Sequence, residues 1–176
     1  QAGLAYTLAT NTTYPSWGYM ADKGATTVWE LWNGDTGDPA MNSGNHVMLV
    51  GDLIVWLYEN LAGIRSDPAQ PAFKHILMKP LPVGDLRHVR ATHRSPYGWI
   101  LSEWHRDDPG RPTERFVWDV TVPVNTTATA FIPCSNPAAV RESANPLAAA
   151  PGVTLIGLQD DSTVVRLGSG SYHFEH

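Results

Sequence analysis

The segment HVMLVGDLIVWLYENLAGI, residues 46–64, decides how the rest of the chain is interpreted. Its apolar residues recur at helical spacing around most of the circumference, and Gly63 stands where a C-terminal glycine cap would stand. The spacing predicts a helix from about Asn45 to Leu61 that is buried on nearly all sides. Such a helix needs several neighbours, and the residues before it supply too few helices. We therefore expect further sequence upstream that packs against it.

Beyond RSDPAQPA, residues 65–72, the pattern changes from helices to strands. Short segments rich in β-branched and aromatic residues alternate with Gly, Pro, Asp or Asn turns, which predicts an all-β sandwich. Residues 95–98 and 107–110 have the composition of hairpin turns. The predicted strand segments are HILMKPLPV (75–83), LRHVRATHRS (86–95), YGWILSEWHR (97–106), RFVWDVTVP (115–123), TATAFIPC (127–134), VTLIGLQ (153–159), STVVRLG (162–168) and SYHFEH (171–176).

The two patterns predict an α+β protein in which helices and strands are segregated along the chain. We expect a helical domain over residues 1–65 and an antiparallel β-sandwich over residues 66–176. The proline-containing stretch 66–71 is the best candidate for a linker. The sequence PLAAAPG, residues 146–152, predicts an exposed loop.

Composition excludes several classes of function. The 176 residues are 43% hydrophobic and 16% charged, with a net charge of -5 and no long basic run, so we expect no nucleic-acid partner. No apolar stretch approaches the roughly 20 residues that span a bilayer, so we expect no membrane segment. The histidines lack the paired spacing of a zinc site, and we expect no metal and no cofactor. Periplasmic, extracellular and cytoplasmic locations all stay open.

The residues with the most chemical promise lie in the first third of the chain. Glu30 stands between Trp29 and Trp32, and Asn45 and His46 follow within sixteen residues. A carboxylate among indoles is partly desolvated, which increases its basicity, while an amide and an imidazole can bind hydroxyl groups. This composition suits sugar chemistry. Glycoside hydrolysis needs a pair of carboxylates, however, and only one strong candidate is present.

The string YPSWGYMADKGATTVWELWNG (14–34), continued by DPAMNSGNHVMLVGDLIVWLYENLAGI (38–64), resembles the end of the catalytic domain of bacterial α-L-rhamnosidases, family 78 of the glycoside hydrolases. The resemblance continues through FKHILMKPLP, the SPYG turn, the SEW strand, NTTATAFIP and the final GSGSYHFE. It therefore covers nearly the whole chain. Leu31 and Asn33 depart from the Arg and Asp of the family's WERWD form.

This resemblance implies that the helices are the last of an (α/α)6 barrel and that the sandwich is the family's C-terminal domain. It implies an inverting hydrolysis in which Glu30, in the GATTxWE motif, is the general base. His46, in the NSxNH motif, would contact the bound rhamnose. Trp29 and Trp32 would shape the pocket wall. Asn45 is a further candidate for a substrate contact, because its amide can bind hydroxyl groups. The expected substrate is a rhamnose-containing glycoside.

The family's general acid belongs to a motif upstream of this segment, so the resemblance implies that the remainder of the same enzyme is a partner. We expect the 176 residues alone to be inactive. The apolar helix would then bury its second face against that remainder, against another copy of the chain by self-association, or in a rearranged packing. Two alternatives stay open: a carbohydrate-binding β-sandwich using Trp99, Trp104 or Trp118, and a structural domain that braces the barrel.

Overall fold

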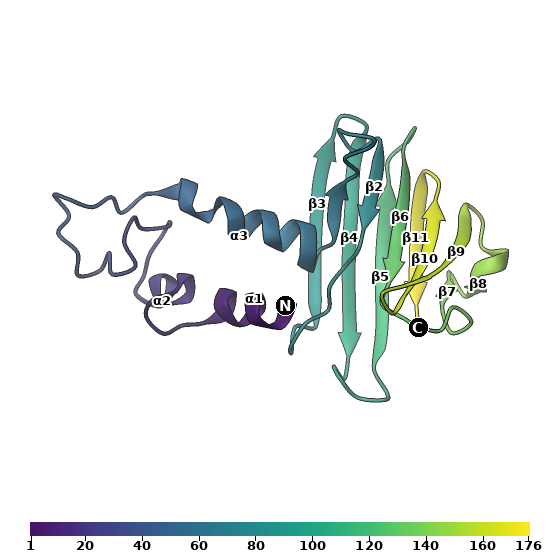
Figure 1. The fold of residues 1–176 in the computed structure, drawn as a ribbon, viewed down its shortest axis with the longest axis horizontal. Coiled ribbons are helices and arrows are strands. Elements are labelled where there is room, and N and C mark those ends of the chain that lie inside the picture. The colour runs from purple at the N-terminus through teal and green to yellow at the C-terminus, as the bar shows by residue number, and fades with distance from the viewer. The chain divides into compact units, whose positions relative to one another are not determined.

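The computed structural model describes residues 1–176, which form two compact units, Gln1–Trp56 and Leu57–His176 (Figure 1). The first unit holds the helices α1 (Ala2–Thr10) and α2 (Trp17–Asp22), the 3-10 turn η1 (Val47–Val50) and the helix α3 (Gly51–Trp56). Residues 23–46 contain no helix or strand. No helix in the chain has both the length and the apolar character needed to span a membrane.

Helix α2 begins with a side-chain cap. Ser16 Oγ accepts a hydrogen bond from the backbone N–H of Tyr19 at 2.9 Å, which satisfies one of the donors that the first turn of α2 leaves unpaired. Residues 34–40, which their Gly, Asp and Pro content predicts to be turns, do form consecutive turns. Glu30 lies in the irregular segment between α2 and η1, so the domain expected to be helical over residues 1–65 is not helical throughout.

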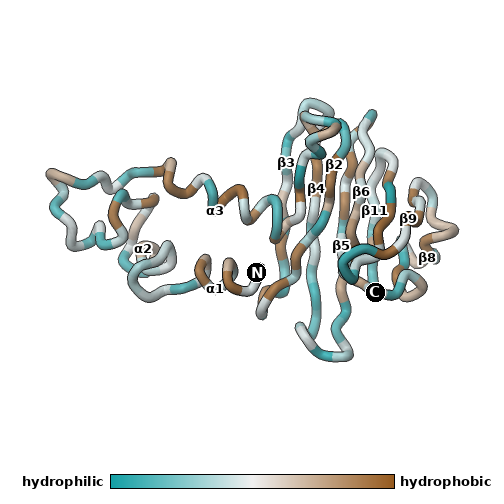
Figure 2. Tube along the Cα trace, in the orientation of Figure 1, coloured by the Kyte–Doolittle hydropathy of each residue, from teal (hydrophilic) through white to brown (hydrophobic).

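The long apolar helix differs from its prediction in two ways. It begins at Val47 rather than Asn45, and its hydrogen bonding passes from 3-10 (Val47–Val50) through α (Gly51–Trp56) to π (Leu57–Leu61, η2). It is also not buried on nearly all sides within this chain. Figure 2 shows hydrophobic residues along α1 and α3, and Met48, Ile54 and Val55 are exposed. These side chains have no further helices to pack against within the 176 residues.

The second unit is a β-sandwich, as predicted. Its five-stranded sheet has the order β1-β2-β6-β10-β9 and its six-stranded sheet the order β3-β4-β5-β11-β7-β8. All eight predicted strand segments contain a strand. The strands are β1 (Ile64–Ser66), β2 (His75–Met78), β3 (His88–Ser95), β4 (Gly98–Asp107), β5 (Arg115–Val122), β6 (Thr127–Ile132), β7 (Arg141–Glu142), β8 (Asn145–Pro146), β9 (Val153–Gln159), β10 (Ser162–Leu167) and β11 (Gly170–Glu175).

Several details of the sandwich correct the sequence analysis. The sandwich is not wholly antiparallel, because β2 pairs with β6 in parallel. The stretch 66–71 is a connection rather than a linker, since it joins β1 to β2, which pair with each other in one sheet. Residues 146–152 are not a fully exposed loop, because Leu147 of the 3-10 turn η3 (Leu147–Ala149) is buried. The predicted turn at residues 95–98 does close the β3–β4 hairpin.

Alternation along β4 and β5 builds the core. Trp104 and Trp118 are fully buried cross-strand neighbours, and their indole N–H groups need acceptors. Trp104 Nε1 donates to the carbonyl of Leu61 at 2.7 Å, and Trp118 Nε1 donates to Ser102 Oγ at 2.9 Å. Ser102 Oγ in turn donates to the carbonyl of Ala62 at 2.6 Å. The sandwich thus supplies donors to two carbonyls at the C-terminus of η2, where helices leave carbonyls unpaired.

Gly63 completes this junction. Its φ of +74° lies in the left-handed region, and a Cβ there would lie 2.2 Å from the carbonyl carbon of Lys79. Its own carbonyl accepts from the N–H of Lys79 at 2.9 Å. Only glycine fits this close approach of two backbones, which confirms the predicted glycine at the helix end.

We expect Ser102→Ala to lower the free energy of unfolding by about 2–4 kcal/mol, because the change leaves the Ala62 carbonyl and the Trp118 N–H buried without partners. Urea denaturation followed by tryptophan fluorescence measures this. Ser171→Ala on β11 is the matched control and should change stability by less than about 0.5 kcal/mol, because Ser171 is exposed. Equal effects of the two variants would contradict the assigned role of Ser102.

Two histidines, the buried His75 and the half-buried His176, make the sandwich sensitive to acid. His75 is 7% exposed and lies between the hydroxyls of Thr127 (2.7 Å from Nδ1) and Thr129 (2.9 Å from Nε2). Burial lowers the pKa of His75, and burial also lowers the pKa of His176, which stacks on Phe116. Both imidazoles are therefore stabilised in their neutral form.

Because the pKa of each histidine is lower in the folded than in the unfolded chain, unfolding takes up protons as the pH falls. The contribution of the two histidines to the free energy of unfolding should be fully present above the unfolded pKa of about 6.5. It should decrease as the pH falls below that value. Urea midpoints measured between pH 7.5 and 5 should show this decrease, and His75→Gln should reduce its slope. His105→Gln on the exposed face of β4 is the control. An unchanged slope in His75→Gln would show that His75 contributes nothing to it.

Candidate active site

The irregular segment around Glu30 is held by backbone pairing with the residues around Ser43. The N–H of Glu30 donates to the carbonyl of Ser43 at 3.0 Å, and the N–H of His46 donates to the carbonyl of Val28 at 2.7 Å. The N–H of Ser43 donates to Glu30 Oε2 at 2.9 Å. The backbone and the side chain of Glu30 are therefore both hydrogen-bonded to Ser43, which fixes the direction of the carboxylate.

His46 lies beside the same carboxylate oxygen. Its Nδ1 is 3.8 Å from Glu30 Oε2, so the two form an ion pair when the imidazole is protonated. The side chains of Glu30 and His46 are 40% and 31% exposed. The structure thus brings together the two residues that the sequence analysis ranked first, although fifteen residues separate them in the chain.

The indoles do not enclose Glu30 in the way the sequence analysis expects. Trp32 packs edge-on against Trp17, with ring centroids 5.6 Å apart. Trp29 lies on Gly34, where a Cβ would be only 2.5 Å from the ring. Both rings therefore brace the segment locally, and the Glu30 carboxylate remains open to solvent in this chain.

Asn45 also makes a local contact. Its Oδ1 accepts a hydrogen bond from Thr27 Oγ1 at 3.1 Å, and its N–H donates to Ser43 Oγ at 3.1 Å. A second bridge ties α2 to this segment, because the hydroxyl of Tyr19 lies 3.1 and 3.3 Å from the two carboxylate oxygens of Asp35. Desolvation and this hydrogen bond raise the pKa of Tyr19, so the phenol stays protonated and donates.

Sequence reasoning missed the supports of the site: Ser43, Trp17, Gly34 and the Tyr19–Asp35 pair. Ser43 acts through its backbone N–H, which carries no side-chain signal. Gly34 offered a signal, since glycine is used where another group approaches the backbone closely. No group of three or more His, Cys, Asp or Glu side chains is arranged to hold a metal ion.

Comparison with known proteins places these residues in a family. Residues 1–61 match the family model of the bacterial alpha-L-rhamnosidase 6 hairpin glycosidase domain, and residues 63–145 match that of the bacterial alpha-L-rhamnosidase C-terminal domain. The chain belongs to the bacterial α-L-rhamnosidase family. The family resemblance inferred from the GATTVWE and MNSGNH strings is therefore confirmed.

Individual α-L-rhamnosidases are similar in sequence to this chain along nearly its whole length. The α-L-rhamnosidase of Streptomyces avermitilis is 35% identical over 97% of this chain, and one from Formosa agariphila is 33% identical over 98%. The crystal structure of the Streptomyces avermitilis enzyme complexed with L-rhamnose superposes with a TM-score of 0.83 at 34% identity over 99% of this chain. The α-L-rhamnosidase structure from Dictyoglumus thermophilum gives 0.81 at 33% identity over 98%.

The chain is much shorter than these rhamnosidases. It spans 16% of the Streptomyces avermitilis protein and 18% of the Formosa agariphila protein. It likewise covers 16% and 18% of the two superposed structures. The residues compared therefore correspond to a small part of each rhamnosidase, although they include both Glu30 and His46.

Gly34→Ala tests how the Glu30 segment is held. The added methyl would collide with Trp29, so we expect the ring to be displaced and the near-ultraviolet circular dichroism of the tryptophans to change. Gly44→Ala is the matched control in the same segment, because a Cβ there meets nothing within 4 Å. Similar spectra for Gly34→Ala and wild type would contradict the packing of Trp29 on Gly34.

Proposed function

We propose that this chain is the C-terminal part of an inverting α-L-rhamnosidase that removes terminal α-L-rhamnosyl residues from glycosides or polysaccharides, with Glu30 as general base. The observation that supports this most directly is the anchored carboxylate of Glu30 beside His46, within the residues that match the glycosidase domain. The names of the similar enzymes supply the substrate class.

The geometry suits a base. Ser43 N–H engages Oε2, which leaves Oε1 to hold a water molecule. In the proposed step this water attacks the anomeric carbon of the rhamnosyl group while Oε1 takes up its proton. The bond to the leaving oxygen breaks, and that oxygen receives a proton from a general acid. The family resemblance puts the motif of the general acid upstream of this segment, so we place the acid in the remainder of the enzyme.

The neighbours of Glu30 have separate roles in this proposal. His46 Nδ1 faces the carboxylate, and its Nε2 would contact a hydroxyl of the bound rhamnose. Asn45 would add a second polar contact, although its Oδ1 is already bonded to Thr27. Trp29 and Trp32 would form part of the pocket wall while they brace the segment. No cofactor is required for a hydrolysis of this kind.

The helices would be the last of an (α/α)6 barrel, and the rest of that barrel would cover them. The exposed apolar side chains of α1 and of the η1–α3 segment, such as Leu4, Leu8 and Ile54, support this. Self-association is the alternative way to cover them. In terms of sequence, we assign residues 1–65 to the barrel domain and 66–176 to the C-terminal domain, a division that falls inside β1.

A purely carbohydrate-binding sandwich has less support. Trp104 and Trp118 are fully buried, so of the three tryptophans weighed for such a function only Trp99, at 58% exposure, presents its ring to solvent. One exposed ring does not make the coplanar aromatic platform that this alternative needs. Bracing of the barrel therefore remains the proposed role of the sandwich as a whole.

Hydrolysis of a chromogenic α-L-rhamnoside by the full-length enzyme tests the proposal. Glu30→Gln should lower kcat by about 10²–10⁴-fold, because the amide cannot take up the proton of the water. The 176 residues alone should show no turnover. The anomeric signal of the first product, followed by proton NMR, should belong to β-rhamnose if the reaction inverts.

Asp38→Asn is the matched control, because Asp38 is another acidic residue of the same segment and its cap to Ala40 N–H survives in asparagine. Its activity should stay within about twofold of wild type. Full activity of Glu30→Gln would remove Glu30 as the base. Cleavage of a different glycoside that still depends on Glu30 would keep the mechanism and change the substrate.

A further inference from the structure

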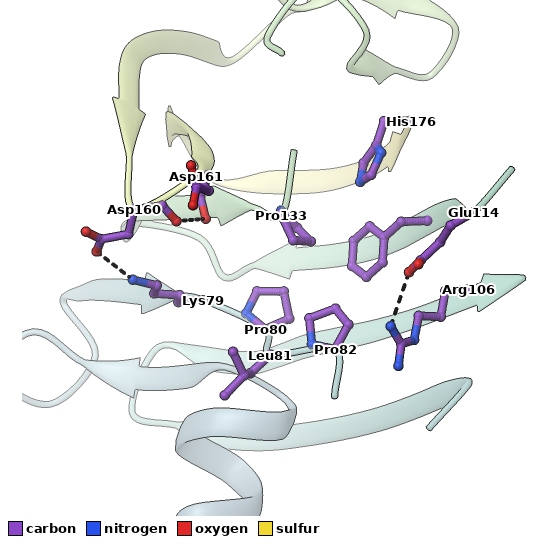
Figure 3. Close-up of a pocket in the computed structure, with 12 residues that line it drawn as sticks. Lys79, Pro80, Leu81, Pro82, Arg106, Glu114, Pro133, Asp160, Asp161 and His176 are labelled. Atoms are coloured by element: carbon purple, nitrogen blue, oxygen red, sulfur yellow. Dashed lines mark hydrogen bonds and ion pairs between the residues drawn. The ribbon is translucent and has the colours of Figure 1, made fainter. Parts of the chain in front are cut away.

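A cavity of about 350 Å³ lies at one end of the sandwich and contains none of the residues of the Glu30 site (Figure 3). Its walls come from the connections at that end: the segment after β2, the end of β4, the start of β5, the segment after β6 and the β9–β10 turn. The residues are far apart in sequence, so only the completed sandwich assembles them. The volume of the cavity lies within the range of roughly 300–1,000 Å³ that is usual for small-molecule sites.

The rim of the cavity is polar but its charges are paired. Lys79 Nζ lies 3.1 Å from Asp160 Oδ2, and Arg106 Nη1 lies 3.2 Å from Glu114 Oε1 (Figure 3). Arg106 also donates to the carbonyls of Leu86 and Gly84, so its guanidinium is fully used by the fold. A rim with matched charges, offering both donors and acceptors, suits a neutral polar ligand better than an ion.

Asp161 is the exception on this rim. It is exposed and forms no hydrogen bond or ion pair, although its neighbour Asp160 is bound to Lys79. Both aspartates have positive φ, +48° and +57°, in the tight turn between β9 and β10. The turn therefore fixes Asp161 at the rim as an available acceptor next to a lysine that can donate.

The inner wall is apolar. Its accessible part is formed by the half-buried Leu81, Pro82 and Pro133, whereas Pro80 and the ring of Phe116, on which His176 stacks, are buried. Proline rings and a leucine side chain present carbon surfaces that can pack on the C–H face of a pyranose. A ligand that combines such a face with hydroxyl groups matches both the wall and the rim.

We propose that this cavity is a second, non-catalytic sugar-binding site that takes an α-L-rhamnosyl unit of the substrate. The identity of the sugar rests on the proposed function. Rhamnose is a 6-deoxy sugar, so its methyl group and C–H face would pack on Leu81, Pro82 and Pro133, the half-buried residues of the wall. Its hydroxyls would donate to Asp161 and accept from Lys79, and the bound unit would hold a branched or polymeric substrate near the enzyme.

Titration of the ¹⁵N-labelled 176-residue chain with methyl α-L-rhamnopyranoside, followed by heteronuclear NMR, tests this proposal. We expect shifts at the amides of Lys79, Leu81 and residues 160–162 with millimolar affinity. Asp161→Asn tolerates the positive φ and removes only the charge, so the chain should fold normally and bind about 3–10-fold more weakly. Lys79→Met should weaken binding similarly. Asp107→Asn, at the exposed end of β4, is the control that should not.

Shifts absent from these amides, or an affinity unchanged by both Asp161→Asn and Lys79→Met, would overturn the proposal. Glu30→Gln should bind the sugar at the cavity as wild type does, which separates this site from the hydrolytic one. Cavity binding in a full-length enzyme without rhamnosidase activity would defeat the proposed function alone. Rhamnosidase activity without cavity binding would defeat this proposal alone.

Discussion

The stability of the sandwich depends on the hydrogen bonds that it donates to the backbone carbonyls at the C-terminal end of the apolar helix. The carbonyls of Leu61 and Ala62 would be buried without partners at the C-terminus of η2, and each unpaired group would cost about 1–3 kcal/mol. Trp104 and Ser102, two positions apart on β4, donate to these carbonyls, and Trp118 on β5 donates to Ser102. The two strands at the centre of the core are therefore the strands that bind the helix end.

The sequence could predict the strands but not this junction. Alternation and turn residues identify β4 and β5, because a half-buried strand must place apolar side chains on one face. Ser102 stands on the inward face between Ile100 and Trp104, where a polar residue looks like an exception to the pattern. Its reason is a carbonyl forty residues earlier in the chain, and local pattern carries no information about such a partner.

The short elements escaped prediction for a related reason. β7 and β8 have two residues each, and β1 has three, so none gives a measurable period. The parallel pairing of β2 with β6 depends on which strands become neighbours in the sheet. Side chains alternate in the same way in parallel and antiparallel pairs of this length, so the alternation does not reveal the pairing. Composition therefore predicts a sandwich well and its topology poorly.

The candidate site shows a similar division. The motif strings led to Glu30 and His46, and the structure brings them within 3.8 Å of each other. The desolvation expected from Trp29 and Trp32 does not follow, because each ring has a nearer partner in Gly34 or Trp17. Adjacency in sequence put the indoles beside the carboxylate, but in an irregular segment the neighbouring side chains can point in different directions.

The two units differ in how much apolar surface each one buries. Every residue of the hydrophobic core cluster lies between Ala62 and Phe174, whereas Ser16 and Met20 are the only buried residues of Gln1–Trp56. The sandwich thus carries its own core. The helical unit buries too little apolar surface to offset the entropy of ordering 56 residues. Under the proposed function, contacts with the remainder of the enzyme would supply the missing burial, and the irregular Glu30 segment is the part of the unit that would gain most from them.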